Sequence, residues 1–177
     1  MNKTQFGSSR EDLSKRATVY ASGLFTGKVV VVTGAGGGLG LAIATLFARL
    51  GANLAINGRN EEKLALAKEF LESFGGEVFA VPMTIREPEQ VEDFVAKTNQ
   101  EFGAIDVLVN NAGGQFPQAA LEFSPKGWNA VIDTNLNGTW WMMQSTARHW
   151  VANKQSGSIV NIVADIWRGM PVRPGQG

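Results

Sequence analysis

The sequence predicts an α/β protein with a doubly wound parallel sheet in three layers, α/β/α. Short β-branched segments and helical segments alternate strictly along the chain from residue 29 onward. Four valines, Val29–Val32, end abruptly in glycines that lead directly into a helical pattern. Strict alternation implies parallel strands joined by right-handed crossovers. The valine run suits a strand that is buried on both faces of such a sheet.

The other elements continue the alternation. Apolar residues recur at helical spacing from Leu39 to Leu50, directly after the valine strand. Residues 1–23 are polar, of mixed charge and without a sustained period, which predicts a flexible arm before a folded domain of residues 24–177. Further strands are predicted at residues 53–57, 77–83, 105–109 and 158–163. Further helices are predicted over residues 64–74, over 88–102 with Pro88 in the first turn, and from a Ser124 cap to about residue 153.

The composition fits one globular domain. The chain has 177 residues, 44% hydrophobic and 18% charged, and its 16 basic residues balance its 16 acidic residues. This balance predicts no long-range attraction to nucleic acid or to a membrane surface. The absence of cysteine and the single histidine argue against a disulfide framework, thiolate chemistry and a histidine-rich metal site. No apolar run is long enough to span a bilayer, and residues 1–23 lack the apolar core of a secretory signal, so we expect a soluble, cytoplasmic protein.

The glycine-rich segment after the valine strand is the first candidate binding feature. A strand, a tight glycine turn and a helix together aim unpaired backbone N–H groups and the positive end of the helix dipole at one point. A phosphate is stabilised there, and larger side chains would keep it out. An ordinary βα turn is the alternative reading. The strand before the turn and the helix after it favour dinucleotide binding.

The end of the second predicted strand bears on the choice of cofactor. In a doubly wound sheet an acidic residue at this place accepts hydrogen bonds from the adenosine ribose, as an NAD site requires. Here the residues are Asn57, Gly58 and Arg59. No carboxylate is present to repel a 2′-phosphate, and the guanidinium of Arg59 offers a planar donor fork. We therefore expect NADP(H), the alternative being that Arg59 is a solvated loop residue.

Two asparagine-containing segments fall near the same edge of the sheet. Asn110–Gly114 follows the fourth strand, where paired asparagines can tie neighbouring strand ends together; a plain turn is the alternative. Asn135 shares a helix face with Trp128, Val131, Ile132 and Thr139, which predicts a core-facing amide. A buried amide needs hydrogen-bond partners. It either bonds backbone or a buried water, or it organises an active site.

These segments together resemble the short-chain dehydrogenase/reductase family, whose members have a Rossmann fold. Thr33–Gly40 is similar to the TGxxxGxG loop of the family, Asn110–Gly113 to its NNAG segment, and Thr134–Thr139 to the segment with its active-site asparagine. The resemblance implies that Asn135 holds a water in a proton relay. It also implies a set of cofactor-binding residues, which comprises Gly34, Gly36, Gly38, Leu39, Gly40, Asn111, Ala112 and Gly113.

Within the family, three short segments resemble the peroxisomal-type trans-2-enoyl-CoA and 2,4-dienoyl-CoA reductases. They are Gly113–Pro117, Ser124–Trp128 and Gly157–Ile162. The resemblance implies NADPH-dependent reduction of a carbon–carbon double bond in an acyl-CoA thioester, with substrate contacts near Gln115 and Phe116. Reductases of 3-oxoacyl thioesters and terpenoid alcohol dehydrogenases share much of this pattern and remain open as carbonyl or alcohol alternatives.

Three departures from the family pattern stand out. Thr84 occupies the position after the third strand where an acidic residue or asparagine usually meets the adenine. Ala164 occupies the position at which family members carry a catalytic serine, and the next residue, Asp165, could act in place of that serine. The Tyr-x-x-x-Lys pair of the family is missing, since the only tyrosine is Tyr20.

These departures lead to the expectation that the chain is the N-terminal portion of a reductase and is inactive alone, with NADP(H) binding weak at best. The alternative is a non-catalytic NADP-binding protein. The aromatic residues and methionines between Trp140 and Trp150 exceed what one helix face needs, which predicts a homo-oligomer for the full-length protein.

Overall fold

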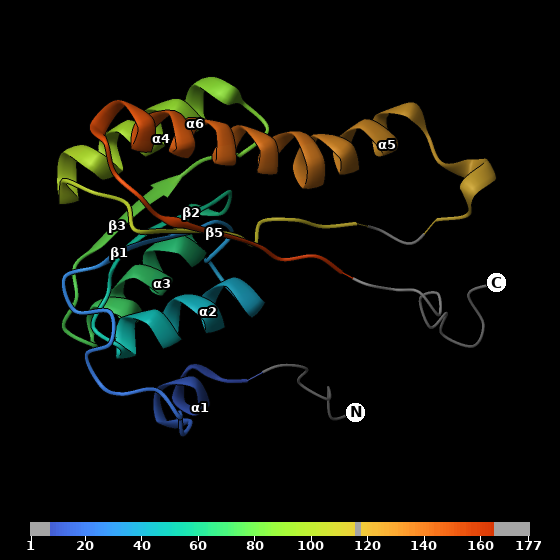
Figure 1. The fold of residues 1–177 in the computed structure, drawn as a ribbon. Helices are drawn as coiled ribbons and strands as arrows, with labels where there is room; N and C mark the ends of the chain where they lie inside the picture. Colours follow the sequence, from blue (N-terminus) through green and yellow to red (C-terminus); the bar gives the residue numbers. More distant parts are fainter. Residues whose placement is uncertain (1–7, 116–117, 165–177) are drawn as a thin grey trace, which may run out of the picture.

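The computed structural model describes residues 8–115 and 118–164. Its centre is one five-stranded sheet in the order β3-β2-β1-β4-β5, with every neighbouring pair parallel (Figure 1). This order confirms the doubly wound arrangement, and the order reverses beside β1. The strands are β1 (Val29–Val32), β2 (Asn53–Gly58), β3 (Val78–Pro82), β4 (Val107–Asn110) and β5 (Ser158–Asn161).

Helices cover both faces of the sheet and complete the three predicted layers (Figure 1). α2 (Gly38–Arg49) and α3 (Glu61–Glu72) lie on one face, and α4 (Pro88–Phe102) and α6 (Gly138–Asn153) lie on the other. The predicted strand boundaries differ from the observed ones by no more than two residues. Among the described residues, no helix combines the length and apolar character needed to cross a bilayer.

The β1 valines explain why the sequence shows a continuous apolar run here instead of an alternating one. Val30 and Val32 pack into the core on the side of α2 and α3, whereas Val31 packs into the core on the side of α4 and α6. All four valines are at most 3% exposed. The central strand is therefore buried on both faces, as predicted.

β5 forms one edge of the sheet and, unlike the other edge strand, β3, contains no buried residue. All four of its residues are exposed.

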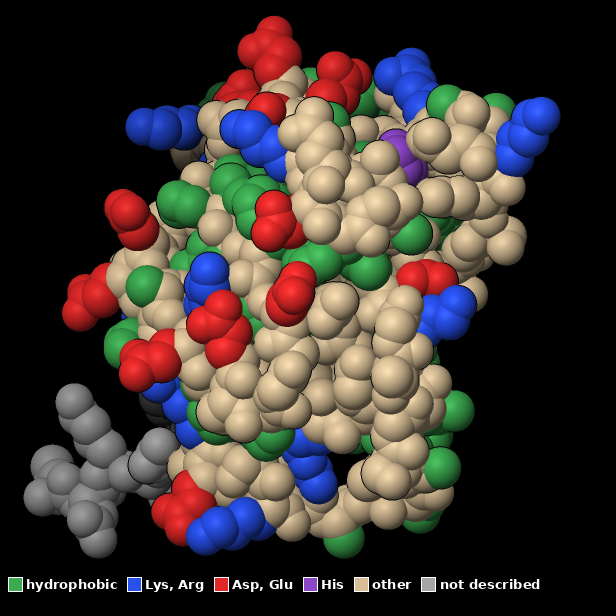
Figure 2. All heavy atoms as spheres, turned by 90° about the vertical axis from the view of Figure 1, so that its left-hand side faces the viewer, with side chains coloured by type: hydrophobic (Ala, Val, Ile, Leu, Met, Phe, Trp, Pro, Cys, Tyr) green, Lys and Arg blue, Asp and Glu red, His purple; other side chains and the backbone are tan. Residues whose placement is uncertain are grey.

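On the face shown in Figure 2, acidic and basic side chains are interspersed among hydrophobic ones, in keeping with the zero formal net charge of the chain.

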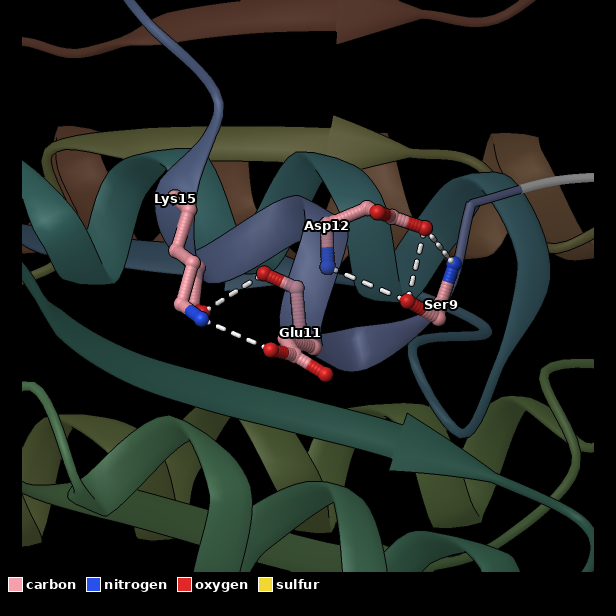
Figure 3. Close-up of polar contacts among 5 residues, drawn as sticks. Ser9, Glu11, Asp12 and Lys15 are labelled. Carbon is pink, nitrogen blue, oxygen red and sulfur yellow. Dashed lines mark hydrogen bonds and ion pairs between the residues drawn. The ribbon is translucent and has the colours of Figure 1, made fainter.

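A short helix, α1 (Arg10–Lys15), forms in the segment for which the sequence predicts a flexible arm. The side chains of Ser9 and Asp12 make a reciprocal capping box, and Lys15 pairs with Glu11 at 2.7 Å (Figure 3). α1 lies against α2, where Arg49 Nη1 donates a hydrogen bond to the Leu13 carbonyl. The sequence pattern does not reveal this helix, because a capping box stabilises a helix that is too short to show a period.

The long helix predicted from Ser124 to about residue 153 is interrupted. It consists of α5 (Pro125–Ile132), a π-helical turn, η2 (Asp133–Asn137), and α6. Ser124 caps α5 as predicted, since its Oγ accepts a hydrogen bond from Gly127 N at 3.1 Å. The described residues also include a short 3₁₀ turn before this helix, η1 (Ala120–Glu122).

The predicted core-facing stripe on this helix is wrong. α5 contains no buried residue, Trp128 is 59% exposed, and Asn135 is exposed as well. The physical reason is visible in Figure 1, where α5 projects beyond the sheet that α6 covers. Helical spacing identifies residues that share a face, but it does not say whether another layer packs against that face.

Candidate functional site

A cavity of about 340 Å³ opens at the carboxyl ends of the strands. In a doubly wound sheet, this edge beside the reversal of strand order is where ligands bind. The cavity is lined by Gly34, Gly37, Leu39, Gly40, Asn57, Gly58, Arg59, Met83, Thr84, Ile85, Arg86, Asn111, Ala112, Gly113 and Thr134.

The glycine turn brings backbone close to backbone at one end of the cavity. A Cβ at Gly40 would clash with the Gly34 carbonyl oxygen and would lie 2.5 Å from Asn111 Nδ2. Gly34 has a positive φ of 69°, and a Cβ there would lie 2.9 Å from the Ala112 Cα. Glycine at these two positions therefore allows α2 to begin directly above the end of β1.

The first turn of α2 carries free hydrogen-bond donors. Its N-cap is Gly37, which has no side chain to bond the N–H groups of the first turn. These groups lack acceptors within the helix, and the positive end of the helix dipole coincides with them. Because Gly37, Leu39 and Gly40 line the cavity, this end of it suits a phosphate.

Two strand ends are tied together beside the turn. Thr33 Oγ1 accepts hydrogen bonds from Asn111 N at 3.0 Å and Ala112 N at 2.9 Å, while Asn111 Nδ2 donates to the Thr33 carbonyl at 3.0 Å. On the other side of β4, Asn110 Nδ2 donates to Asn161 Oδ1 at 2.9 Å. The predicted tie by paired asparagines is confirmed, whereas the part of Thr33 in it is a new finding. Its position as a polar residue at the end of a buried apolar strand is the signal that identifies it.

The end of β2 contributes Asn57, Gly58 and Arg59 to the cavity wall. Asn57 is 1% exposed, and its Oδ1 accepts a hydrogen bond from Gly34 N at 3.2 Å. Thr84, after β3, also lines the cavity, and its hydroxyl accepts a hydrogen bond from Arg86 N at 3.3 Å. The lining set contains two arginines and no Asp or Glu.

Arg86 is held in place across the cavity. Its Nε donates to Thr134 Oγ1 at 2.6 Å, and that hydroxyl donates to the Ala130 carbonyl at 2.8 Å. Neither Arg86 nor Arg59 forms an ion pair with an acidic residue of the described part of the chain. Their charge is available for an anionic ligand.

Asn135 contacts the loop after β4. Its Oδ1 accepts a hydrogen bond from Gly114 N at 3.0 Å, and its Nδ2 donates to the Gly114 carbonyl at 2.7 Å. Gly113 passes so close that a Cβ there would lie 2.7 Å from Asn135 Oδ1. The structure therefore brings Asn135 and the Asn110–Gly114 segment together, although the asparagine lies on an exposed turn.

A second cavity of about 260 Å³ adjoins the first and shares Arg59, Arg86, Gly113 and Thr134 with it. Gln115 lines this second cavity. The other two predicted substrate residues, Phe116 and Asp165, lie outside the described residues.

Two predicted cofactor residues do not line the first cavity. Gly36 would bring a Cβ within 3.7 Å of Leu64 N on α3, and Gly38 is the first residue of α2, with a φ of 56°. Gly37 lies at the cavity in their place. No group of three His, Cys, Asp or Glu residues within 8–115 and 118–164 could hold a metal ion.

The donor set around the first cavity fits a nicotinamide dinucleotide. The uncapped start of α2 offers donors to a pyrophosphate, the arginines offer donors to a further phosphate, and Ala112 and Gly113 leave room close to the backbone. Gly34, Gly37 and Gly40 carry no side chains, so the backbone of the turn stays open to a phosphate.

Comparisons with known proteins match the chain to one family. The family model for short chain dehydrogenases matches residues 28–168. A probable 2,4-dienoyl-CoA reductase of Bacillus subtilis is 39% identical over 137 residues, which are 77% of this chain and 54% of that protein. A gluconate 5-dehydrogenase of Gluconobacter oxydans is 38% identical over 137 residues, 77% of this chain and 53% of that protein.

Among solved structures, a citronellol catabolism dehydrogenase (AtuB) of Pseudomonas aeruginosa PAO1 matches with a TM-score of 0.80 and 39% identity. The match covers 87% of this chain and 63% of that one. The chain spans about half the length of the curated relatives it matches. With the family match extending over most of its length and the glycine turn in place, the chain belongs to the short-chain dehydrogenase family of oxidoreductases.

Proposed function

We propose that residues 24–177 form the NADP(H)-binding portion of a short-chain oxidoreductase that reduces an enoyl- or dienoyl-CoA thioester. On its own, this chain is expected to bind the cofactor weakly at best and not to turn over substrate. Members of the family bind nicotinamide cofactors. The choice of NADP(H) and of an acyl-CoA substrate goes beyond family membership and is argued from the site and the relatives.

One observation carries the cofactor assignment: the cavity wall contains Arg59 and Arg86 and no carboxylate. A 2′-phosphate adds two negative charges at the adenosine end of the cofactor, and a guanidinium fork can bind it with two parallel hydrogen bonds. An NAD site would instead present an acidic residue to the ribose hydroxyls. The electrostatics of this wall therefore favour the phosphorylated cofactor.

Support for an acyl-CoA thioester comes from the relatives. The Bacillus subtilis protein is a probable 2,4-dienoyl-CoA reductase, and a probable 2,4-dienoyl-CoA reductase 3 of Caenorhabditis elegans is 38% identical over 148 residues. Reduction or oxidation at a carbonyl or alcohol is the second candidate function. The gluconate 5-dehydrogenase of similar identity favours it.

Within the proposed reaction, the bound cofactor supplies a hydride. The residues of this chain bind and orient: the start of α2 holds the pyrophosphate, Arg59 holds the 2′-phosphate, and Asn111 to Gly113 line the ribose. Asn135, fixed on Gly114, holds a water for a proton relay. These groups position the reactants but do not themselves donate a proton.

The chain carries no tyrosine at this site. Its only tyrosine, Tyr20, lines a different cavity beside α2 together with Leu46 and Arg49. The described residues that line the first cavity include no tyrosine, aspartate or glutamate that could donate a proton to complete a hydride transfer to carbon. The same observation supports the third candidate, a non-catalytic NADP-binding protein.

The surface of α6 supports self-association of the full-length protein. Trp140 is 50% exposed and Val151 is 81% exposed, and both line an apolar groove together with Ile159 of β5. Large exposed apolar groups of this kind are typical of surfaces covered by a partner. A homo-oligomer is therefore part of the proposal.

The cofactor assignment is tested by Arg59→Gln. The dissociation constant for NADPH is expected to rise about tenfold, with little change for NADH, since the charged donor serves only the added phosphate. Lys97→Gln is the matched control, because it removes one positive charge from α4 outside the cavity. An equal effect of Arg59→Gln on both dinucleotides would contradict the assignment.

The substrate assignment needs a longer protein that contains this sequence. We expect 2,4-dienoyl-CoA or 2-enoyl-CoA to be turned over with a higher kcat/KM than 3-oxoacyl thioesters or terpenoid alcohols. Turnover of the oxo or alcohol compounds alone would favour the second candidate. Enoyl-CoA-dependent NADPH oxidation by the 177-residue chain itself would contradict the expectation that it is inactive.

A further inference from the structure

Thr134 connects the π-helical turn η2 to the loop after β3, where Arg86 lies. Arg86 Nε donates a hydrogen bond to Thr134 Oγ1 at 2.6 Å. The Thr134 hydroxyl donates its one proton to the Ala130 carbonyl at 2.8 Å. Its oxygen therefore faces Arg86 as an acceptor, which is the only role that can satisfy an arginine N–H.

Packing fixes the same two segments one helical turn further along the chain. A Cβ at Gly138, the first residue of α6, would lie 2.6 Å from Ile85 Cγ1 and 2.9 Å from the Ile85 carbonyl oxygen. Glycine at this position allows the start of α6 to approach the loop after β3 so closely. The hydrogen bond between Arg86 and Thr134 thus joins segments that packing already holds together.

The bond at Nε leaves the rest of the Arg86 guanidinium free. Its terminal nitrogens, Nη1 and Nη2, form no hydrogen bond or ion pair with any residue that the structure describes. These two nitrogens form a planar edge with parallel donors, which matches two oxygens of a phosphate. A side chain that is held at Nε also has less rotamer freedom to lose when a ligand binds.

The anchored guanidinium lies where the two cavities meet. Arg86 and Thr134 line both the first and the second cavity, and Arg59 lines both as well. No Asp or Glu is among the described residues that line either cavity. The hydroxyl at position 134 therefore sets the direction of one of two arginines that face the same space.

We propose that Thr134 is a positioning residue, which aims Arg86 so that this arginine and Arg59 together hold one phosphate, the 2′-phosphate of the dinucleotide. The inference rests on the proposed NADP(H) function and adds to it a residue of η2, a turn remote in sequence from both arginines. Thr134 does not bind the phosphate itself. It acts by fixing the orientation of the Arg86 guanidinium.

Thr134→Val tests this role, because valine keeps the branched shape of the side chain and removes the acceptor. The dissociation constant for 2′,5′-ADP is expected to rise about threefold to tenfold, whereas that for 5′-AMP, which lacks the 2′-phosphate, stays unchanged. Thr134→Ser restores the hydroxyl and is expected to bind both nucleotides as the unmodified chain does.

Thr98→Val is the matched control. Thr98 Oγ1 donates to the Phe94 carbonyl at 2.8 Å, the same kind of bond within a helix that Thr134 makes to Ala130. Thr98 lies in α4 and does not line either cavity. Its substitution makes the same chemical change and is expected to leave both dissociation constants unchanged.

A double-mutant cycle distinguishes positioning from a merely structural role. Arg86→Gln is expected to weaken 2′,5′-ADP binding about tenfold. Thr134→Val added to it should cause no further loss, because the hydroxyl acts only through the guanidinium. Arg86→Lys keeps the charge but lacks the fork, so it should weaken binding at least as much as Thr134→Val does. This variant tests the same contact from the other side if Thr134→Val does not fold.

The outcomes separate this inference from the proposed function. A preference of the unmodified chain for 2′,5′-ADP over 5′-AMP, combined with additive losses in the cycle or with equal losses for both nucleotides, would overturn this inference alone. No preference for 2′,5′-ADP, or binding of neither nucleotide, would overturn the proposed function with it.

Discussion

The side chain of Asn135 binds both backbone groups of Gly114. Its Oδ1 accepts a hydrogen bond from Gly114 N at 3.0 Å, and its Nδ2 donates one to the Gly114 carbonyl at 2.7 Å. Nδ2 also donates to the Val131 carbonyl at 2.8 Å. The asparagine belongs to the π-helical turn between α5 and α6, and such turns occur frequently at functional sites. It thereby connects a helix that projects from the sheet to the loop after β4.

Removal of this amide is expected to loosen the loop. Asn135→Ala should lower the free energy of unfolding by about 1 to 2 kcal/mol, because the lost bonds are exposed and water replaces part of them. Urea unfolding measures the change. Asn129→Ala is the control, since Asn129 is an exposed residue of α5 whose side chain bonds to no described residue. Equal effects of the two substitutions would contradict a special role for Asn135.

Two glycines of the turn should respond differently to the same substitution. Gly40→Ala places a Cβ against the Gly34 carbonyl and should destabilise the fold by about 1 to 3 kcal/mol. Gly37→Ala finds no atom within 4 Å, so it should leave stability nearly unchanged and weaken only dinucleotide binding. Thermal unfolding and a binding titration on both variants separate the effects. A stable Gly40→Ala variant would show that α2 can move away from the turn.

Thr33→Val tests the tie between β1 and the end of β4. The shape is conserved, but Asn111 N and Ala112 N lose their buried acceptor, which should cost about 2 to 4 kcal/mol. Thr45→Val is the control. Thr45 is also buried, but its hydroxyl donates to Leu41 O within its own helix, so its loss should cost less than about 1 kcal/mol. Denaturant midpoints that shift equally would argue against the tie.

The pH dependence of α1 follows from its capping box. Hydrogen bonds from the Ser9 side chain, and then from the Ser9 backbone, hold the pKa of Asp12 below its ordinary value of 3.8. The ionised Asp12 carboxylate therefore stabilises the helix at pH values above its ordinary pKa. This contribution is lost as the pH falls through the lowered pKa. NMR titration should show Asp12 titrating at a higher pH in Ser9→Ala. Identical midpoints in the two proteins would rule out the capping box in solution.

Much of the fold is predictable from the sequence because local signals and global arrangement agree. The valine run predicts a strand buried on both faces, and the glycines after it predict the start of α2. Asn111 is predictable as a tie for the same reason, since it follows a buried strand. These signals need no knowledge of which elements become neighbours.

The parts that the sequence does not predict depend on distant contacts. Arg86 meets Thr134 from 48 positions away, so no spacing along the chain reveals the pair. The exposure of Asn135 depends on the extent of the sheet, since α5 projects beyond it. In each case the residue type suggests a polar contact, and only the packing decides its partner.

The central claim, a cavity built for the phosphorylated cofactor, is tested most directly by the dissociation constants of NADPH and NADH for the unmodified chain. Both are to be measured on one preparation at one low ionic strength, since salt weakens the interaction with the added phosphate. The account predicts tighter binding of NADPH by about tenfold or more. Equal affinities, or tighter binding of NADH, would contradict it.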